Sequence, residues 1–257
     1  MEQGDIKKQI LDKLEEIETR ENVRVLYAVE SGSRAWGVES PDSDYDVRFI
    51  YLRPKDDYLR LDEIRDVIEW QLDDILDING WDIKKTLIQF HKGNATLFEW
   101  ANSPVVYKTT ALWQGIYEEC RRYFSRKASL CHYYGTAKST YEQYLTQEQV
   151  RYKKYVYALR PLLACRYIDE NGSVPPVSFE ELLEQKLEGG LYNEIMRMLE
   201  IKAQSGEKAL NPRMPQIHQY IEDEIERYAV LSRTVQEDRN PDWNILNRIY
   251  RKVCVGE

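Results

Sequence analysis

The chain has 257 residues, 42% of them hydrophobic and 31% charged, which suits one large or two modest folded domains and excludes an intrinsically disordered chain. Its net charge of −8 excludes a general polycation for nucleic acid, so any nucleic-acid site must be a local patch. No apolar run approaches the roughly 18 residues of a membrane-spanning helix. Residues 1–20 lack the apolar segment of a signal peptide, so we expect a cytoplasmic protein with no membrane partner.

Cysteine and histidine usage argues against several kinds of site. No two cysteines form a C-x-x-C pair, and their spacing matches no zinc or disulfide framework. With three histidines and no G-x-S-x-G turn, a serine or cysteine catalytic triad has little support. The cysteines are Cys120, Cys131, Cys165 and Cys254.

The first hundred residues mix helical and strand patterns. Four apolar residues at helical spacing predict an opening amphipathic helix: Ile6, Ile10, Leu14 and Ile17. The runs at residues 23–29 and 46–51 predict strands. Residues 67–72 and 75–78 predict a hairpin, and Asp82 stands where the N-cap of a following helix belongs.

From residue 103 onward the apolar residues recur at helical spacing. The helical segments lie near residues 110–124, 126–145, 148–169, 178–187, 190–204, 213–237 and 242–253. We therefore predict an α+β fold, in which a small mixed β-sheet domain at residues 1–104 precedes an all-helical domain at residues 105–257.

One segment of the first domain carries residues suited to phosphate and metal chemistry. Gly32-Ser33 follows a predicted strand, where glycine lets the backbone approach a phosphate and free N–H groups at a helix start favour an anion. Asp44 and Asp46 stand two apart at the start of the next strand, so that strand alternation points both carboxylates to one face. Oxygen ligands on one face suit Mg²⁺, and two such ions clamp the attacking and leaving oxygens of phosphoryl transfer. For residues 40–43 the alternative is a simple turn that leads into a strand.

This order of Gly-Ser, a ten-residue spacer and Asp-x-Asp resembles the nucleotidyltransferase superfamily that includes DNA polymerase β, kanamycin nucleotidyltransferase and poly(A) polymerases. Residues 32–37 (GSRAWG) and 42–51 (DSDYDVRFIY) are more similar to the bacterial YcgL family of RlaP-type, RNA-ligase-associated predicted nucleotidyltransferases. The similarity continues through residues 76–82, 97–104 and 150–161, and so covers most of the chain. It implies a catalytic domain at residues 1–104 and a helical substrate-binding domain at residues 105–257.

The resemblance also implies a third carboxylate on a later strand. Asp77 stands at the start of the apolar end of a predicted strand and matches the position of this carboxylate best. We therefore expect it to complete the catalytic and metal-binding set with Asp44 and Asp46. Asp82 is the competitor, but an N-cap already has a structural task. Three other acidic residues are better explained as turn residues: Asp42, Asp73 and Asp74.

Two arginines and a tryptophan flank the motif. Arg34 follows Gly32-Ser33 and is expected to bind nucleotide with them. Arg48 lies on the strand face of Asp46, where it either pairs with that carboxylate or reaches a phosphate. Trp36 is expected to pack in the protein rather than to stack on a base.

The helical half contains a locally basic stretch between residues 121 and 166. Only Glu142 and Glu148 are acidic there, and seven tyrosines between residues 133 and 157 are interleaved. Two interpretations are open. These residues either form solvated helix faces over a tyrosine-rich core, or line a cleft and neutralise the charge of a triphosphate or an RNA backbone. By the resemblance, Lys153 or Lys154 is expected to lie over the triphosphate. The basic residues are Arg121, Arg122, Arg126, Lys127, Lys138, Arg151, Lys153, Lys154, Arg160 and Arg166.

The leading hypothesis is a nucleotidyltransferase that uses Mg²⁺ or Mn²⁺ and a nucleoside triphosphate, and releases pyrophosphate. Its acceptor hydroxyl belongs to an RNA end, a protein or a small molecule. The alternative is a non-catalytic nucleotide- or RNA-binding module of the same fold. A purely structural interaction protein ranks last, because it leaves Gly-Ser and Asp-x-Asp unexplained.

Overall fold

The computed structural model describes residues 3–40, 43–71, 75–187, 189–204, 209–237 and 239–255. The chain forms two compact units. The sheet unit comprises Met1–Ala35, Asp44–Phe124 and Arg239–Glu257, and the helical unit comprises Trp36–Ser43 and Ser125–Asp238. Within the described residues, every helix is too short or too polar to cross a lipid bilayer.

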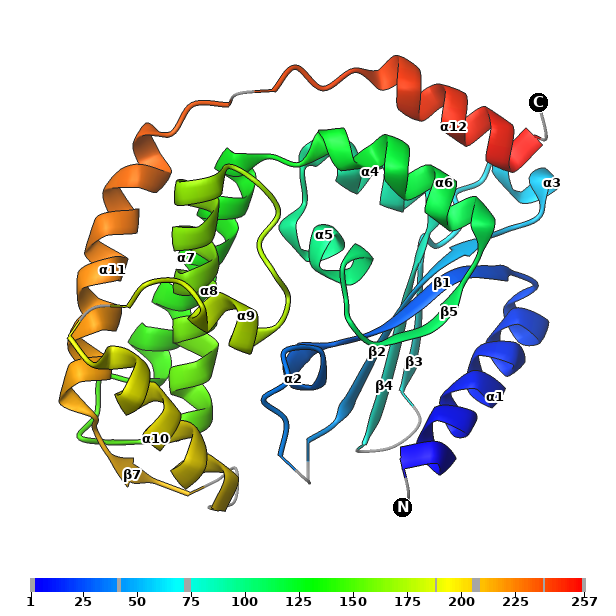
Figure 1. Ribbon diagram of the computed structural model, residues 1–257. Helices are drawn as coiled ribbons and strands as arrows, with labels where there is room; N and C mark the ends of the chain where they lie inside the picture. The colour runs from blue at the N-terminus through cyan, green and yellow to red at the C-terminus, as the bar shows by residue number, and fades with distance from the viewer. Residues whose placement is uncertain are drawn as a thin grey trace. The chain divides into compact units, whose positions relative to one another are not determined.

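The sheet unit is built around one five-stranded sheet (Figure 1). Its elements in chain order are α1 (Gln3–Glu21), β1 (Arg24–Ser31), α2 (Gly32–Ala35), β2 (Tyr45–Leu52), α3 (Lys55–Tyr58), β3 (Val67–Gln71), β4 (Leu76–Asp82), α4 (Ile83–Lys92), α5 (Ala95–Ala101), β5 (Val106–Thr109), α6 (Ala111–Cys120), the 3₁₀ turn η1 (Arg121–Tyr123) and α12 (Trp243–Val255). The strand order is β3-β4-β2-β1-β5, with β2 and β4 parallel and the other neighbours antiparallel. This mixed sheet and the helical region after it confirm the predicted α+β fold.

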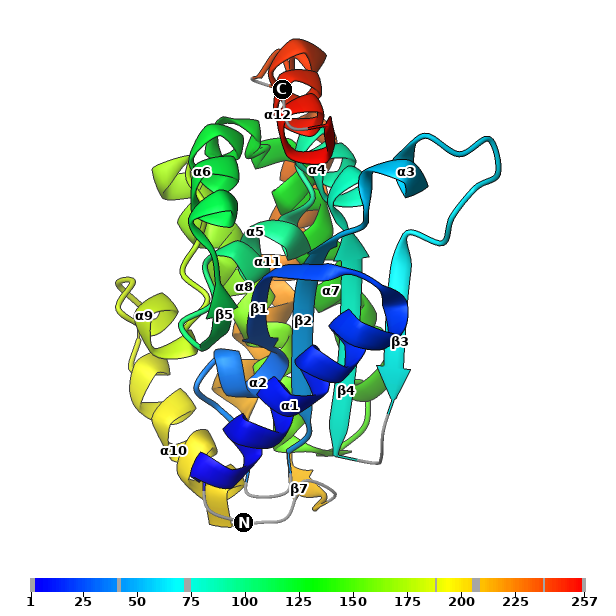
Figure 2. The same ribbon diagram turned by 90° about the vertical axis from the view of Figure 1, so that its right-hand side faces the viewer.

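Helix α1 covers one face of the sheet (Figure 2). Its four apolar residues pack with the buried side chains Val47, Phe49 and Tyr51 of β2, as their spacing predicted. The ring of Phe49 lies where a side chain on its strand neighbour Gly80 would stand, so only glycine fits there. Because successive strand side chains alternate, Asp46 and Arg48 lie on the other face, the one toward α4 and α5.

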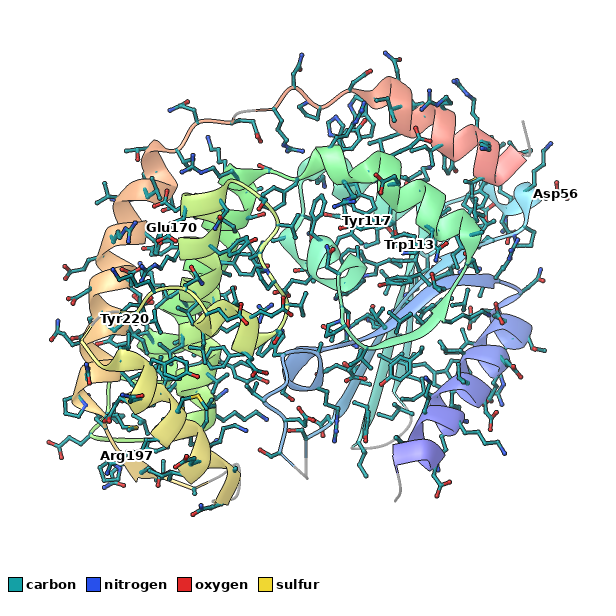
Figure 3. The ribbon with its side chains drawn as sticks, in the orientation of Figure 1. Asp56, Trp113, Tyr117, Glu170, Arg197 and Tyr220 are labelled. Atoms are coloured by element: carbon teal, nitrogen blue, oxygen red, sulfur yellow. The ribbon has the colours of Figure 1, made fainter. Side chains whose placement is uncertain are left out.

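An aromatic cluster packs α6 against β1 and α4 within the sheet unit. The ring of Trp113 stacks on Tyr27 of β1 with centroids 4.8 Å apart. Trp113 and Tyr117, both labelled on α6 in Figure 3, stack with centroids 6.2 Å apart. Phe90 of α4 extends the cluster, 6.3 Å from Trp113. Burial of several large rings supplies much of the hydrophobic stabilisation of this face.

The helical unit packs α7, α8 and α11 side by side. Its elements are α7 (Arg126–Tyr144), β6 (Gln149–Val150), α8 (Tyr152–Asn171), α9 (Phe179–Leu183), α10 (Leu191–Gln204), β7 (Asn211–Pro212) and α11 (Pro215–Thr234). Helix α8 is buried on most sides, as a central helix must be. The segment 36–43 packs into this unit: Lys202 of α10 donates to Val38 O at 2.8 Å and to Ser40 Oγ at 2.9 Å.

The units do not follow the single boundary expected between residues 104 and 105. Val106–Thr109 pairs with β1 as strand β5, although this short, half-exposed segment has no clear alternating pattern. Helix α12, at the end of the helical half, belongs to the sheet unit. The expected turn residues Asp42, Asp73 and Asp74 lie outside the described residues.

Candidate functional site

Gly32 begins the turn that leaves β1 and enters α2. Its φ of +62° is a left-handed conformation that L side chains rarely adopt. A Cβ there would also overlap the Oδ2 atom of Asp46. The glycine therefore lets the Asp46 carboxylate lie directly against the backbone, and the following Ser33 is buried.

Asp46 and Asp77 are strand neighbours. They are paired in the parallel register of β2 and β4, so both side chains leave the sheet on the same face. Arg48 Nη2 donates to Asp46 Oδ1 at 3.0 Å and to Asp77 Oδ2 at 2.8 Å. Of the two uses weighed for Arg48, the structure shows the pairing with Asp46, and it adds Asp77 as a second partner.

Arg34 connects α2 to the start of β2. Its Nε donates to the backbone oxygen of Asp44 at 3.1 Å, and its guanidinium lies 3.7 Å from the ring centroid of Tyr45. Asp44 is exposed and immediately precedes the strand, and within the described part of the chain its carboxylate has no hydrogen-bond or ion-pair partner. This arrangement holds the Asp44 backbone beside the Gly32 turn and leaves the carboxylate accessible.

Glu30 is a buried carboxyl in this neighbourhood to which the sequence analysis gave no role. It is 1% exposed, and it accepts hydrogen bonds from Asp46 N at 2.8 Å and from the hydroxyl of Tyr107. Burial raises the pKa of Glu30 to about 7, against the lowering effect of these two hydrogen bonds. An acidic residue at the end of the otherwise apolar run 25–29 was the available signal, because a buried charge in a strand needs partners.

Asp82 lies on the opposite side of β4 from Asp77, since the two residues are an odd number apart. It is 4% exposed, caps α4 by accepting from Lys84 N at 2.7 Å, and accepts from the Tyr58 hydroxyl at 2.8 Å. Burial raises the pKa of Asp82. These contacts give Asp82 the cap role expected from the sequence.

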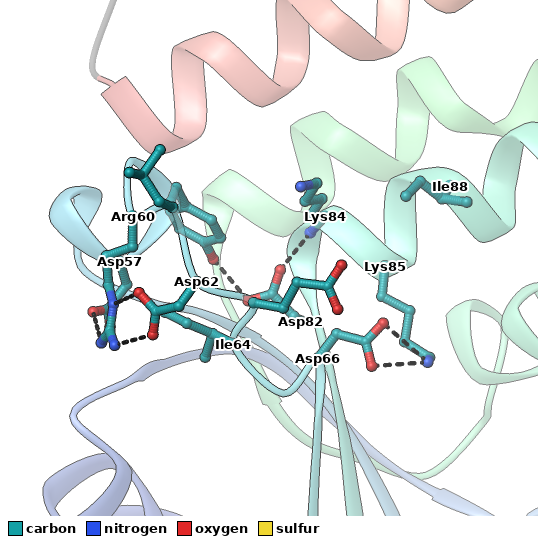
Figure 4. A pocket seen from close by; sticks show the side chains of 12 residues that line it. Asp57, Arg60, Asp62, Ile64, Asp66, Asp82, Lys84, Lys85 and Ile88 are labelled. Atoms are coloured by element: carbon teal, nitrogen blue, oxygen red, sulfur yellow. Dashed lines mark hydrogen bonds and ion pairs between the residues drawn. The ribbon is translucent and has the colours of Figure 1, made fainter.

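A pocket of about 430 Å³ opens beside Asp82 (Figure 4). Lys85 pairs there with Asp66 at 3.1 Å, and Arg60 pairs with Asp62. The pocket lies at the far end of β4 from Asp77, and is therefore separate from the Asp46–Asp77 pair.

Lys153 and Lys154 form a cluster of their own in the helical unit. The ammonium of Lys154 lies 3.9 Å from the ring centroid of Tyr144 and 5.4 Å from that of Tyr157, and Lys153 lies 5.9 Å from Tyr157. The two ammonium groups thus make cation–π contacts with the rings of Tyr144 and Tyr157, which we call the aromatic platform.

Two other residues near this cluster are packing residues. Trp36 meets Tyr157 edge-on at 5.1 Å, in line with the packing role expected for it. Arg160 was grouped with the basic stretch, but it is 2% exposed, donates to Val177 O at 3.2 Å and lies 4.6 Å from the ring centroid of Trp36. It is a core residue, not part of a basic surface.

The chemistry of Asp46 and Asp77 fits a divalent cation such as Mg²⁺. Each carboxylate directs one oxygen at the same cationic nitrogen of Arg48, so two hard oxygen donors converge on one point. No group of three His, Cys, Asp or Glu side chains placed for a metal occurs among the described residues. Mg²⁺ is usually held by one or two carboxylates, with its other ligands from substrate phosphates and water.

The chain is similar to known proteins over nearly its whole length. Residues 6–252 match the family described as "RlaP: RNA repair pathway DNA polymerase beta family". The chain is 42% identical over 252 residues to the uncharacterized protein YcgL of Bacillus subtilis (strain 168), which covers 95% of each chain. It also resembles the crystal structure of a nucleotidyltransferase-like protein from Exiguobacterium sibiricum 255-15, with a TM-score of 0.30 and 13% identity over 89% of this chain and 75% of that one. From the family match and the YcgL relative together, the chain belongs to the RNA repair pathway DNA polymerase beta family.

Proposed function

We propose that this protein is a metal-dependent nucleotidyltransferase that transfers a nucleoside monophosphate from a nucleoside triphosphate to an acceptor hydroxyl. The observation that carries the proposal is the in-register pair Asp46 and Asp77, which directs two carboxylates at one point with Asp46 against the Gly32 turn. A family named for DNA polymerase beta supports the same class of reaction.

The Gly32 turn would receive the triphosphate. Gly32 keeps the backbone free of a side chain beside Asp46, and Ser33 and Arg34 supply the polar groups that follow it. Asp44, Asp46 and Asp77 would hold Mg²⁺ or Mn²⁺. When bound, such ions neutralise charge on the triphosphate and make the reacting phosphorus more electrophilic.

Asp77 would orient and deprotonate the acceptor hydroxyl. Its side chain is 50% exposed, against 32% for Asp46, so it is the more open of the two carboxylates to a second substrate. The acceptor oxygen forms a bond to the α-phosphorus, the bond to the bridging oxygen breaks, and pyrophosphate leaves with the negative charge. The acceptor proton passes to the Asp77 carboxylate.

An RNA end is the acceptor that we favour, because the family is named for RNA repair. The Lys153 and Lys154 cluster of the helical unit supports this choice, since cations on an aromatic platform suit the backbone and bases of a single strand.

The test is transfer of label from each α-³²P-labelled nucleoside triphosphate with Mg²⁺ or Mn²⁺, alone and with total RNA. We expect label in RNA, and none in Asp46→Asn. Label in the protein or in a small molecule would keep the reaction class and replace the acceptor. Tight, metal-dependent nucleotide binding with no transfer to any acceptor would favour the non-catalytic binding module.

A further inference from the structure

Arg48 occupies the point at which the two carboxylates of the site converge. Its Nη2 donates to both Asp46 and Asp77, and its Nη1 donates to the backbone oxygens of Val47 and Asp77, each at 3.1 Å. The arginine side chain is 17% exposed and so is more enclosed than either carboxylate. The guanidinium is thus fixed by four hydrogen bonds between the two strands.

A cation at this point has an electrostatic reason. Asp46 and Asp77 are direct neighbours across β2 and β4, and two adjacent carboxylates repel each other in the absence of a counter-charge. The guanidinium supplies that charge and keeps both carboxylates on the same point. The guanidinium also occupies one oxygen of each carboxylate, and a divalent ion shared by the two carboxylates would need the same oxygens.

We propose that Arg48 is a built-in counter-ion that holds the cation position between Asp46 and Asp77, and that a divalent metal must displace it there. The inference rests on the proposed function, because it takes these carboxylates as metal ligands. Arg48 therefore weakens the binding of bare metal ions and makes metal loading depend on the triphosphate, whose oxygens offset the displaced ion pairs. Its bonds to the two backbone oxygens are independent of the carboxylates and retain the side chain nearby.

The experiment measures Mn²⁺ binding to the full chain without nucleotide, by electron paramagnetic resonance and calorimetry. Arg48→Gln should bind Mn²⁺ at least about tenfold more tightly than the parent, because a fixed positive charge about 3 Å from both ligands is gone. Arg48→Lys keeps the charge and should stay near the parent. Arg20→Gln, which removes an exposed ion pair with Glu16 in the same unit, is the matched control and should bind as the parent does.

Two further variants locate the effect. The gain of Arg48→Gln should vanish when Asp46→Asn and Asp77→Asn are added, because the gained ion binds there. If Arg48→Gln does not fold, the parent gives the answer: exchange of the Arg48 guanidinium protons, followed by nitrogen-15 resonance, should accelerate on addition of Mg²⁺ with a non-hydrolysable nucleotide and not with Mg²⁺ alone.

Affinity for Mn²⁺ in folded Arg48→Gln that equals or falls below that of the parent would overturn the proposal, and so would guanidinium exchange that ignores the metal–nucleotide complex. Neither readout requires transfer activity. If Arg48→Gln gains Mn²⁺ affinity but the parent shows no nucleotide transfer, the role of Arg48 stands and the enzyme assignment is rejected. If the parent transfers nucleotide but Arg48→Gln gains no Mn²⁺ affinity, the enzyme assignment stands and the role of Arg48 is rejected.

Discussion

At the scale of single residues, Gly32 is constrained both by its backbone conformation and by the neighbouring Asp46. Gly32→Ala meets both a left-handed backbone and the Asp46 carboxylate, so we expect a loss of about 1–2 kcal/mol in the free energy of unfolding and loss of metal–nucleotide binding. Gly37→Ala is the control, because Gly37 has a similar φ of +73° with no atom within 4 Å of a Cβ. Calorimetric titration with Mg²⁺ and nucleotide, together with urea unfolding, measures both effects. Equal nucleotide affinities in the two variants would show that Asp46 is not disturbed by the added methyl group.

The two carboxylates of β4 should respond differently to substitution. The side chain of residue 77 is half-exposed, and in Asp77→Asn its amide oxygen can still accept a hydrogen bond from Arg48. This variant should therefore fold normally and still bind Mg²⁺ with nucleotide. Its transfer rate should fall by orders of magnitude, because amide oxygen cannot take the acceptor proton. Asp82→Ala should cost about 1 kcal/mol or more of stability through the lost cap, with Tyr58 also losing its acceptor, and leave much of the activity.

Label-transfer rates and urea unfolding of both variants measure this contrast. Full activity in Asp77→Asn, with transfer abolished in a stable Asp82→Ala, would exchange the two roles.

At the scale of elements, the sequence predicted those with a strong local pattern. The alternation in β2 and the helical spacing in α1 follow from burial of one face, so both were found from the sequence. Strand β5 was missed because its pairing with β1 is non-local and its residues are only half-buried. The meeting of Asp46, Asp77 and Arg48 depends on the parallel register of β2 and β4, which no local pattern encodes.

Within the sheet unit, α12 and the residues before it contact α4 at His91. The His91 ring stacks on Trp243 with centroids 3.7 Å apart, and Arg239 Nη1 donates to the backbone oxygens of His91 at 2.9 Å and of Tyr123 at 2.8 Å. Burial, followed by the charge of Arg239, lowers the pKa of His91. The folded protein therefore disfavours the protonated imidazole relative to the unfolded chain.

This shift predicts how stability depends on pH. Below about pH 6.5 the unfolded chain binds a proton on His91 that the folded chain resists, so the contribution of His91 to the free energy of unfolding decreases as the pH falls. Buried Glu30, whose pKa is raised to about 7, contributes in the opposite direction, so the effect of His91 is measured as a difference between variant and parent. His91→Phe keeps a ring on Trp243 and removes the titration, so the free energy of unfolding of this variant, relative to that of the parent, should rise between pH 7.5 and pH 5.5. Urea unfolding at both pH values measures it. Exposed His132→Gln is the control and should keep the pH dependence of the parent. The same pH dependence in His91→Phe as in the parent would exclude a contribution from His91.

At the scale of the whole molecule, the chain passes between the two units within the motif itself. Ala35 ends the sheet-unit segment that carries Gly32, Asp44 resumes it, and the residues between them belong to the helical unit. There Phe179 N donates to Trp36 O at 2.9 Å, and Lys202 holds Val38 and Ser40. Residues 36–43, which are eight of the ten residues of the spacer, thus belong to the helical unit.

The last prediction concerns Lys153 and Lys154, which we expect to contact the triphosphate or the RNA backbone. Each phosphate contact releases condensed counter-ions, so the logarithm of affinity falls with the logarithm of salt concentration in proportion to the number of contacts. Lys153→Gln with Lys154→Gln should weaken RNA binding at low salt and flatten this slope by about one to two. Arg160 is left unchanged, because its side chain is buried beside Trp36 and its loss would disturb the core.

The control removes the same charge elsewhere. Lys7→Gln with Lys8→Gln neutralises two exposed lysines on α1, the helix on the face of the sheet opposite Asp46, and should leave the slope as in the parent. Fluorescence anisotropy of labelled single-stranded RNA over a roughly sixfold range of KCl, about 50–300 mM, measures the slope for all three proteins. If both double variants flatten the slope equally, the loss reflects net charge alone, and Lys153 and Lys154 belong to a solvated helix face. If only the α8 variant does so, the aromatic platform under these lysines is the place where the helical unit binds the nucleic acid.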